Sequence, residues 1–187
     1  MVFDVPALGP APYLTLAGIT LLAAATPLLL LRKTTLAATL RGAAVVVALL
    51  LPAMLVLALS MTRNSVEVQG GQLVVRAGFF YEYARDIHDF DLARARHGSQ
   101  AAVVPQGLGP RDNGIRLPGY AAGRFHAGVQ EGSTAALFVT LTDSDRVVYL
   151  PTRTGQALLV SVERGDELLQ MLYDAAPGAG VQLSHID

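Results

Sequence analysis

The stretch GAAVVVALLLPAMLVLALSMT, residues 42–62, decides the architecture of this chain of 187 residues. It contains no charged side chain, and Arg63 ends it. About 20 apolar residues in a helix cross the roughly 30 Å hydrocarbon core of a bilayer. Each Leu, Ile or Val favours insertion by about 0.3–0.6 kcal/mol. The stretch therefore predicts a transmembrane helix over residues 42–62.

A second uncharged run covers residues 5–31, with eight leucines between Leu14 and Leu31. It predicts another transmembrane helix over about residues 12–31. Proline inside each run is compatible with this, because membrane helices tolerate it. A cleaved signal peptide would begin with basic residues, whereas the first charge here is Asp4. Helices of a soluble bundle would show a polar face, whereas these two runs are apolar all round. A re-entrant pair would be too short to cross the bilayer, whereas both runs are long enough, so two spanning helices are expected.

The connection between the two runs is short and basic, with Arg32, Lys33 and Arg41. So short a connection predicts that the two helices are antiparallel. Both ends of the chain would then lie on the same side of the membrane. Basic loops stay in the cytoplasm, so we expect the remainder of the chain to be extracytoplasmic. Lys33 is the only lysine beside many arginines, a usage typical of GC-rich bacterial genomes. The expected location is therefore the bacterial inner (plasma) membrane, which the chain would cross twice. No ionisable residue interrupts either run, which favours an anchor over an ion pathway.

The charge and cysteine content of the rest of the chain exclude several kinds of site. After Arg63 there are 10 basic and 14 acidic residues, a formal −4, which disfavours nucleic-acid binding. The chain has no cysteine, so disulfides, thiolate zinc sites and thiol nucleophiles are excluded.

Residues 64–174 have a sequence pattern that is typical of a small β domain. Alternating runs at 66–68 and 73–75 flank Gly70-Gly71, which predicts a hairpin. Residues 79–83 and 87–95 look extended, and a second hairpin is predicted across Thr142–Asp145, between runs at 135–141 and 146–150. Together these runs predict about seven antiparallel strands in a barrel or sandwich, after the transmembrane hairpin of residues 1–63.

Two segments of this domain are expected to depart from strand structure. Residues 97–123 are rich in Gly and Pro and predict a long loop. Near the C-terminus, Leu168, Leu169, Leu172 and Tyr173 share one helical face, which predicts a helix over about 163–174. Residues 175–187 are expected to form a flexible tail.

Four short motifs carry a resemblance to a known family. They are GIRLPGYAAGRF at 114–125, LFVT at 137–140, RVVYLPT at 146–152 and LLVS at 158–161. In this order, and before a closing helix, they resemble the bacterial pleckstrin-homology (PH) domain family that follows a pair of transmembrane helices. The resemblance implies a PH-like fold and a membrane-tethered binding module, and it implies no particular ligand.

The 111–125 segment holds the candidate binding residues, because arginines flank aromatic side chains among glycines there. Such a loop suits a peptide or an anionic group. The alternative is that its glycines shape a turn while the aromatics pack inside the barrel. The candidates are Arg111, Arg116, Leu117, Tyr120, Arg124 and Phe125.

No catalytic residue, metal site or cofactor is predicted. His88, His97, His126 and His185 belong to no catalytic motif, and the β domain has no lysine for a phosphate loop. In a strand, Asp86 and His88 would face away from Asp89 and Asp91, which is a poor set of metal ligands. The expected function is a non-catalytic, membrane-anchored PH-like interaction module that binds an unknown protein partner at the envelope. The alternative is a sensor of a lipid headgroup or small ligand through the 111–125 segment.

Overall fold

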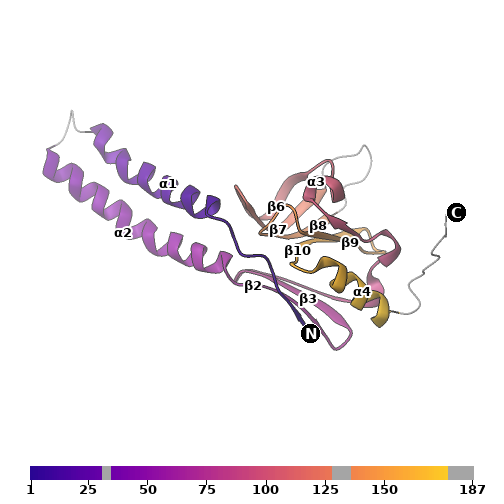
Figure 1. Cartoon of the computed structure of the whole chain (residues 1–187). Coiled ribbons are helices and arrows are strands. Elements are labelled where there is room, and N and C mark those ends of the chain that lie inside the picture. The colour runs from indigo at the N-terminus through magenta and orange to yellow at the C-terminus, as the bar shows by residue number, and fades with distance from the viewer. Residues whose placement is uncertain (31–34, 128–135, 177–187) are drawn as a thin grey trace.

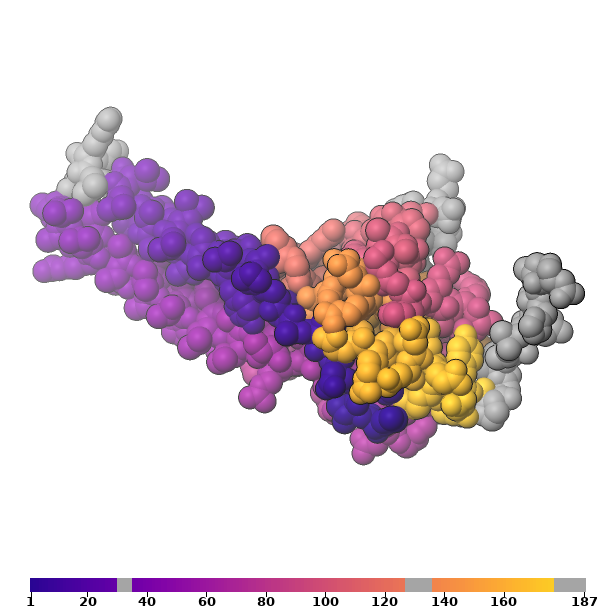
Figure 2. Space-filling view, in the orientation of Figure 1, coloured from indigo at the N-terminus to yellow at the C-terminus, as the bar shows by residue number. Residues whose placement is uncertain are grey.

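The computed structural model describes residues 1–30, 35–127 and 136–176. Two long apolar helices precede a mostly β domain with two sheets and a C-terminal helix (Figure 1). The helices lie side by side and project from the domain as a rod (Figure 2).

The first helix is α1 (Ala11–Ala25), continued by the 3-10 helix η1 (Thr26–Leu30), and the second is α2 (Leu36–Met61). The rise per residue gives α1 plus η1 about 32 Å and α2 about 39 Å, so both are long enough to cross a bilayer. The change to 3-10 geometry at Thr26 precedes Pro27, which cannot donate a helical hydrogen bond. The hydroxyls of Thr15, Thr20 and Thr26 each donate to the carbonyl four residues earlier, so these polar groups are satisfied within the helix.

The second helix starts six residues before its predicted first residue. Thr35 caps it by accepting a hydrogen bond from Ala38 N at 3.3 Å, and Arg41 is therefore helical instead of lying in the connection. Arg32 and Lys33 lie outside the described residues.

The segment before α1 belongs to the β domain, which corrects its assignment to the membrane hairpin. Strand β1 (Val2–Phe3) pairs antiparallel with β2 (Asn64–Gln69), and Phe3 is buried in the core. Glu163 N also donates to Asp4 O at 2.9 Å. The domain therefore holds the near end of the rod through two chain segments, β1 before α1 and β2 after α2.

The smaller sheet has the order β1-β2-β3-β4, with β2 (Asn64–Gln69), β3 (Gln72–Ala77) and β4 (Tyr81–Asp86). Gly70 and Gly71 form the β2–β3 turn with φ of 59° and 80°, as the sequence predicts. Positive φ at both central residues is the reason for the Gly-Gly pair.

The larger sheet has the order β5-β9-β10-β8-β7-β6. Its strands are β5 (Arg96–Gly98), β6 (Leu108–Leu117), β7 (Tyr120–Ala127), β8 (Ala136–Leu141), β9 (Val147–Pro151) and β10 (Gln156–Ser161). The predicted β8–β9 pairing is wrong, because β10 inserts between them and pairs parallel with β8. Residues 157–161 of β10 are all buried, and such a run belongs in the centre of a covered sheet. The described residues thus hold ten strands, three more than expected, and the sheet is not wholly antiparallel.

Three segments predicted from local sequence have other structures. Most of the expected 97–123 loop is ordered as part of β5, the short helix α3 (Gln100–Val103), β6 and the start of β7. The β6–β7 hairpin turns at Pro118-Gly119, where Gly119 has φ of 75°, the value that a type II turn requires. The expected strand at 87–95 is instead two 3-10 turns, η2 (Ile87–Asp89) and η3 (Leu92–Arg94).

Two apolar cores lie on the two faces of the larger sheet. One joins it to the smaller sheet and to α4 (Gly165–Ala175), whose Leu168 and Leu172 are fully buried. The other, with Phe125, Val139 and Leu159, lies beneath α3 and the residues directly after it. Helix α4 corresponds to the helix expected at 163–174, and residues 177–187 of the expected tail lie outside the described residues.

Candidate functional site

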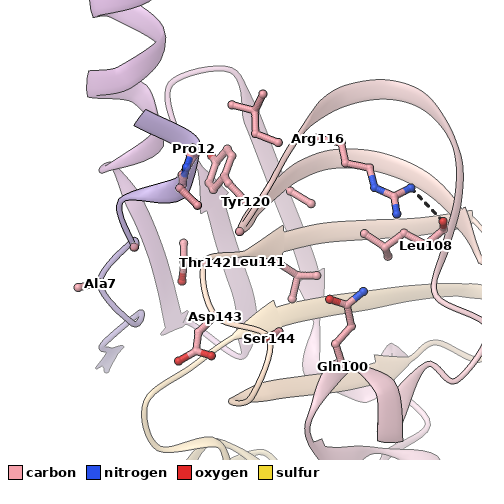
Figure 3. A pocket seen from close by; sticks show the side chains of 15 residues that line it. Ala7, Pro12, Gln100, Leu108, Arg116, Tyr120, Leu141, Thr142, Asp143 and Ser144 are labelled. Atoms are coloured by element: carbon pink, nitrogen blue, oxygen red, sulfur yellow. Dashed lines mark hydrogen bonds between the residues drawn. The ribbon is translucent and has the colours of Figure 1, made fainter. Parts of the chain in front are cut away.

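A cavity of about 460 Å³ lies where the start of α1 meets the β domain (Figure 3). We call it the α1-foot cavity. Its walls come from the segment leading into α1, from α3, from both strands of the β6–β7 hairpin and from the β8–β9 turn. The side chains that line it include Pro12, Gln100, Arg116, Tyr120, Thr142 and Asp143.

Packing of the β6–β7 turn against α1 forms one wall. A Cβ on Gly119 would lie 3.7 Å from Pro12 and 3.8 Å from Ala11, so the turn and the helix start are in contact distance. Tyr120 follows directly and is only 3% exposed. Burial raises the pKa of its phenol, and the neighbouring Tyr81 and Tyr13 add to the effect. The phenol of Tyr120 is therefore uncharged, and its side chain packs between the helices and the sheet.

Arg116 supplies the positive charge of the cavity. Its Nη1 donates to Leu108 O at 3.1 Å, the dashed line in Figure 3. Among the described residues no carboxylate lies within 4 Å of its guanidinium. A guanidinium has five N–H donors, and within the described part of the chain only the bond to Leu108 O uses one of them, which leaves donors for a ligand.

Asp143 lies on another side of the cavity and is already paired. Its carboxylate accepts from Asp145 N at 2.8 Å and from Arg146 Nε at 2.9 Å. The hydrogen bond from Asp145 lowers the pKa of Asp143, and Arg146 lowers it further against the opposing effect of burial. Because Arg146 compensates this negative charge and no carboxylate among the described residues compensates Arg116, the cavity favours an anion.

The β8–β9 turn is held in place by Ser161 of β10. Ser161 Oγ accepts from Thr142 N at 3.1 Å and from Asp143 N at 3.2 Å, and it donates to Asp143 O at 2.7 Å. The hydroxyl of Thr142, which also lines the cavity, is buried and has no hydrogen-bond partner among the described residues.

The structure does not bring the six predicted site residues together in one place. Arg116, Leu117 and Tyr120 line the α1-foot cavity. Arg124 lines a different pocket of about 520 Å³ beside Arg85 and Asp112. The register pairs Arg116 with Ala121, and Ala121 and Arg124 lie on opposite faces because side chains alternate along a strand.

The other two predicted residues lie in neither pocket. Phe125 is fully buried, and its ring lies close to Gly114. Arg111 is exposed, and its Nη1 donates to Gly114 O at 3.4 Å. The interpretation that aromatics of this segment pack inside the domain thus holds for Tyr120 and Phe125.

Several cavity residues were not predicted from the sequence. Gln100, Thr142 and Asp143 come from elements far apart in the chain, and so does the segment before α1. The sequence signals at these positions are only those of a polar turn and of a proline near a helix start. Neither signal indicates that the two segments meet.

Two histidines pair with carboxylates away from the cavity. His97 Nδ1 lies 3.0 Å from Asp166 Oδ1, and His126 Nε2 lies 2.7 Å from Asp112 Oδ1. In the part of the chain that the structure describes, neither ring has a hydrogen bond to a serine or threonine hydroxyl. Within the same residues no three of His, Cys, Asp and Glu cluster as metal ligands.

Comparisons with protein-family models, with curated proteins and with solved structures give no match to this chain. The resemblance to the bacterial PH-like family therefore stays a prediction that rests on the quoted motifs.

Proposed function

We propose that this protein is a two-pass, membrane-anchored binding module of PH-like type that catalyses no reaction. The two apolar helices serve as the anchor, and β1 and β2 join the domain to the start of α1 and to the end of α2 at the near end of the rod. The two sheets and the closing helix α4 support the PH-like description, while the ten strands of the described residues and the parallel β8–β10 pair depart from it.

The ligand that the geometry favours is an anionic group, such as a lipid phosphate headgroup or a free small anion, bound in the α1-foot cavity. The observation that carries this proposal is Arg116, a cation without a carboxylate partner among the described residues, in a cavity at the start of a membrane helix. The cavity lies at headgroup level if α1 spans the bilayer, and its volume is in the range of small-molecule sites.

Ligand-induced stabilisation of the purified full-length protein in a neutral detergent tests this. We expect short-chain phosphatidylglycerol to raise the unfolding temperature and short-chain phosphatidylcholine to raise it less. Inorganic phosphate in a third arm separates a headgroup from a free anion. R116A should remove about 1.5–3 kcal/mol of binding free energy, because it deletes charge-assisted hydrogen bonds.

R124A is the matched control, since Arg124 is also exposed but lines the other pocket. Equal loss of binding in R116A and R124A, or no stabilisation by either anion, would show that the cavity is not the site.

A protein partner, the first expectation from the sequence, is favoured by one specific observation. Among the described residues strand β4 pairs with β3 alone, so its outer edge is open to an added strand from another chain. Photo-crosslinking in intact cells from A84C on β4, labelled at its thiol with a benzophenone maleimide, tests this against the equally labelled Q72C at the β2–β3 turn, since both positions are exposed. A partner bound at β4 gives a product from the first position only.

The side of the membrane is tested with the same Q72C variant, because the chain has no native cysteine. We propose that the domain is extracytoplasmic, so an impermeant maleimide should label Q72C in intact cells. Protection until lysis would place the domain in the cytoplasm.

A further inference from the structure

The β3–β4 turn exposes two aromatic side chains, Phe79 at 56% and Phe80 at 59%. Their rings meet edge to face, with centroids 6.3 Å apart. Outside α1, η1 and α2, the other large apolar side chains exposed among the described residues are Met1 and Val2. Two neighbouring exposed aromatic side chains on an otherwise polar domain surface indicate a contact with an apolar partner or phase.

The turn is attached to the last turn of α2. Phe79 N donates to Ser60 Oγ at 3.0 Å, and a Cβ on Gly78 would lie 2.9 Å from Ser60 O. Asn64 bridges the same two segments, because its Nδ2 donates to Met61 O at 2.7 Å and its Oδ1 accepts from Gly78 N at 3.1 Å. Phe79 and Phe80 are thus held beside the end of α2.

This attachment fixes the depth of the two rings relative to α2. The uncharged run of α2 ends at Arg63, three residues after Ser60. If α2 spans the bilayer, Ser60 to Arg63 mark the boundary between acyl chains and headgroups, where aromatic side chains gather. Figure 1 shows the β2–β3 hairpin leading away from this level, and Met1 pairs with Val68 near its far end.

We propose that Phe79 and Phe80 insert into the headgroup–acyl boundary of the leaflet nearest the domain. They form a second membrane contact, separate from the two helices, that orients the domain on the bilayer. The inference rests on the proposed membrane span of α2. Continuity with that helix selects lipid as the occupant over a second copy of the chain.

Single-tryptophan fluorescence tests the insertion, because the chain contains no native tryptophan. The full-length variants F80W, Q72W and L49W are reconstituted in vesicles of phosphatidylcholine brominated either near the headgroup or near the chain end. Gln72 is exposed at the far turn, and Leu49 is exposed midway along α2.

We expect bromines near the headgroup to reduce F80W emission about twofold and to leave Q72W unchanged, as for an aromatic side chain at the interface. L49W should respond most to bromines near the chain end. F79W repeats the measurement at the neighbouring ring and guards against a local defect in F80W.

The outcomes separate the inference from its premise. If L49W is quenched while F80W and F79W match Q72W, the helices span but the rings stay in water, and the inference is wrong. An F80W blue shift that depends on protein concentration, without quenching by lipid, would assign the pair to a protein contact instead. An unquenched L49W would overturn the membrane span itself.

Discussion

Ser161 and Asp143 form a closed pair of hydrogen bonds between β10 and the β8–β9 turn. Asp143 N donates to Ser161 Oγ at 3.2 Å, and the same hydroxyl donates to Asp143 O at 2.7 Å. Since Ser161 is fully buried, this contact holds one wall of the α1-foot cavity from the protein interior.

S161A should therefore destabilise the domain. It leaves the N–H groups of Thr142 and Asp143 without their acceptor, which costs about 1–3 kcal/mol of the free energy of unfolding. Denaturant unfolding of the purified protein in detergent measures the change. S144A is the control, because the Ser144 side chain is exposed, and its unfolding midpoint should stay near that of the parent protein.

T140V should leave the domain equally stable or stabilise it by up to about 1 kcal/mol, because it removes a buried hydroxyl that has no partner. Thr140 is fully buried in β8, and no hydrogen bond to its Oγ1 is found among the described residues. T152V is the matched variant, since Thr152 Oγ1 donates to Gln156 O at 2.8 Å and accepts from Gln156 N at 3.1 Å. A larger loss in T140V than in T152V, seen as unfolding temperature, would contradict this expectation.

G78A should be more destabilising than G71A. Both glycines have positive φ, 64° and 80°, and alanine there costs about 1–2 kcal/mol. Of the two, Gly78 alone also faces a close neighbour, Ser60 O at 2.9 Å, whereas among the described residues nothing lies within 4 Å of a Cβ on Gly71. The difference in unfolding free energy between the two variants therefore measures how closely the β3–β4 turn packs against α2. Equal effects would mean that the turn can move away from Ser60 at no cost.

D143N should reduce the dependence of stability on acid pH. The lowered pKa of Asp143 means that the unfolded chain binds this proton more readily than the folded one. At a pH above the pKa that Asp143 has in the unfolded chain, its carboxylate therefore stabilises the fold. This contribution to stability is lost as the pH falls below about 4 and through the lower pKa that Asp143 has in the folded chain. Unfolding midpoints between neutral and acid pH should fall less steeply in D143N, from a lower starting value. Parallel curves for the two proteins would rule out this role.

Much of the architecture could be predicted where local sequence suffices. The two helices result from uncharged runs, the β2–β3 hairpin from Gly70-Gly71, and α4 from the spacing of Leu168 and Leu172. The loop predicted at 97–123 is wrong because its glycines and prolines lie in turns, bulges and an edge strand. Turn residues alone do not distinguish these from a loop.

The candidate site could be predicted only in part. Arg116, Leu117 and Tyr120 do share a cavity, but Arg124 lies in another pocket, on the face of the sheet opposite to Arg116. Once β6 and β7 are recognised as paired strands, their alternation separates the two arginines. A loop assignment hides that constraint.

By itself, the sequence determined the apolar rod and the β character of residues 64–161, because both depend on hydrophobicity and on turns between near neighbours. The tertiary structure alone decided that β10 lies between β8 and β9, and that residues 2–3 join the sheet after α2. It also decided that the start of α1 meets the Arg116 hairpin, and that Phe79 lies beside Ser60. These contacts join segments that are distant in the chain. Which segments meet is decided by burying all the apolar faces at once, and no local pattern records that outcome.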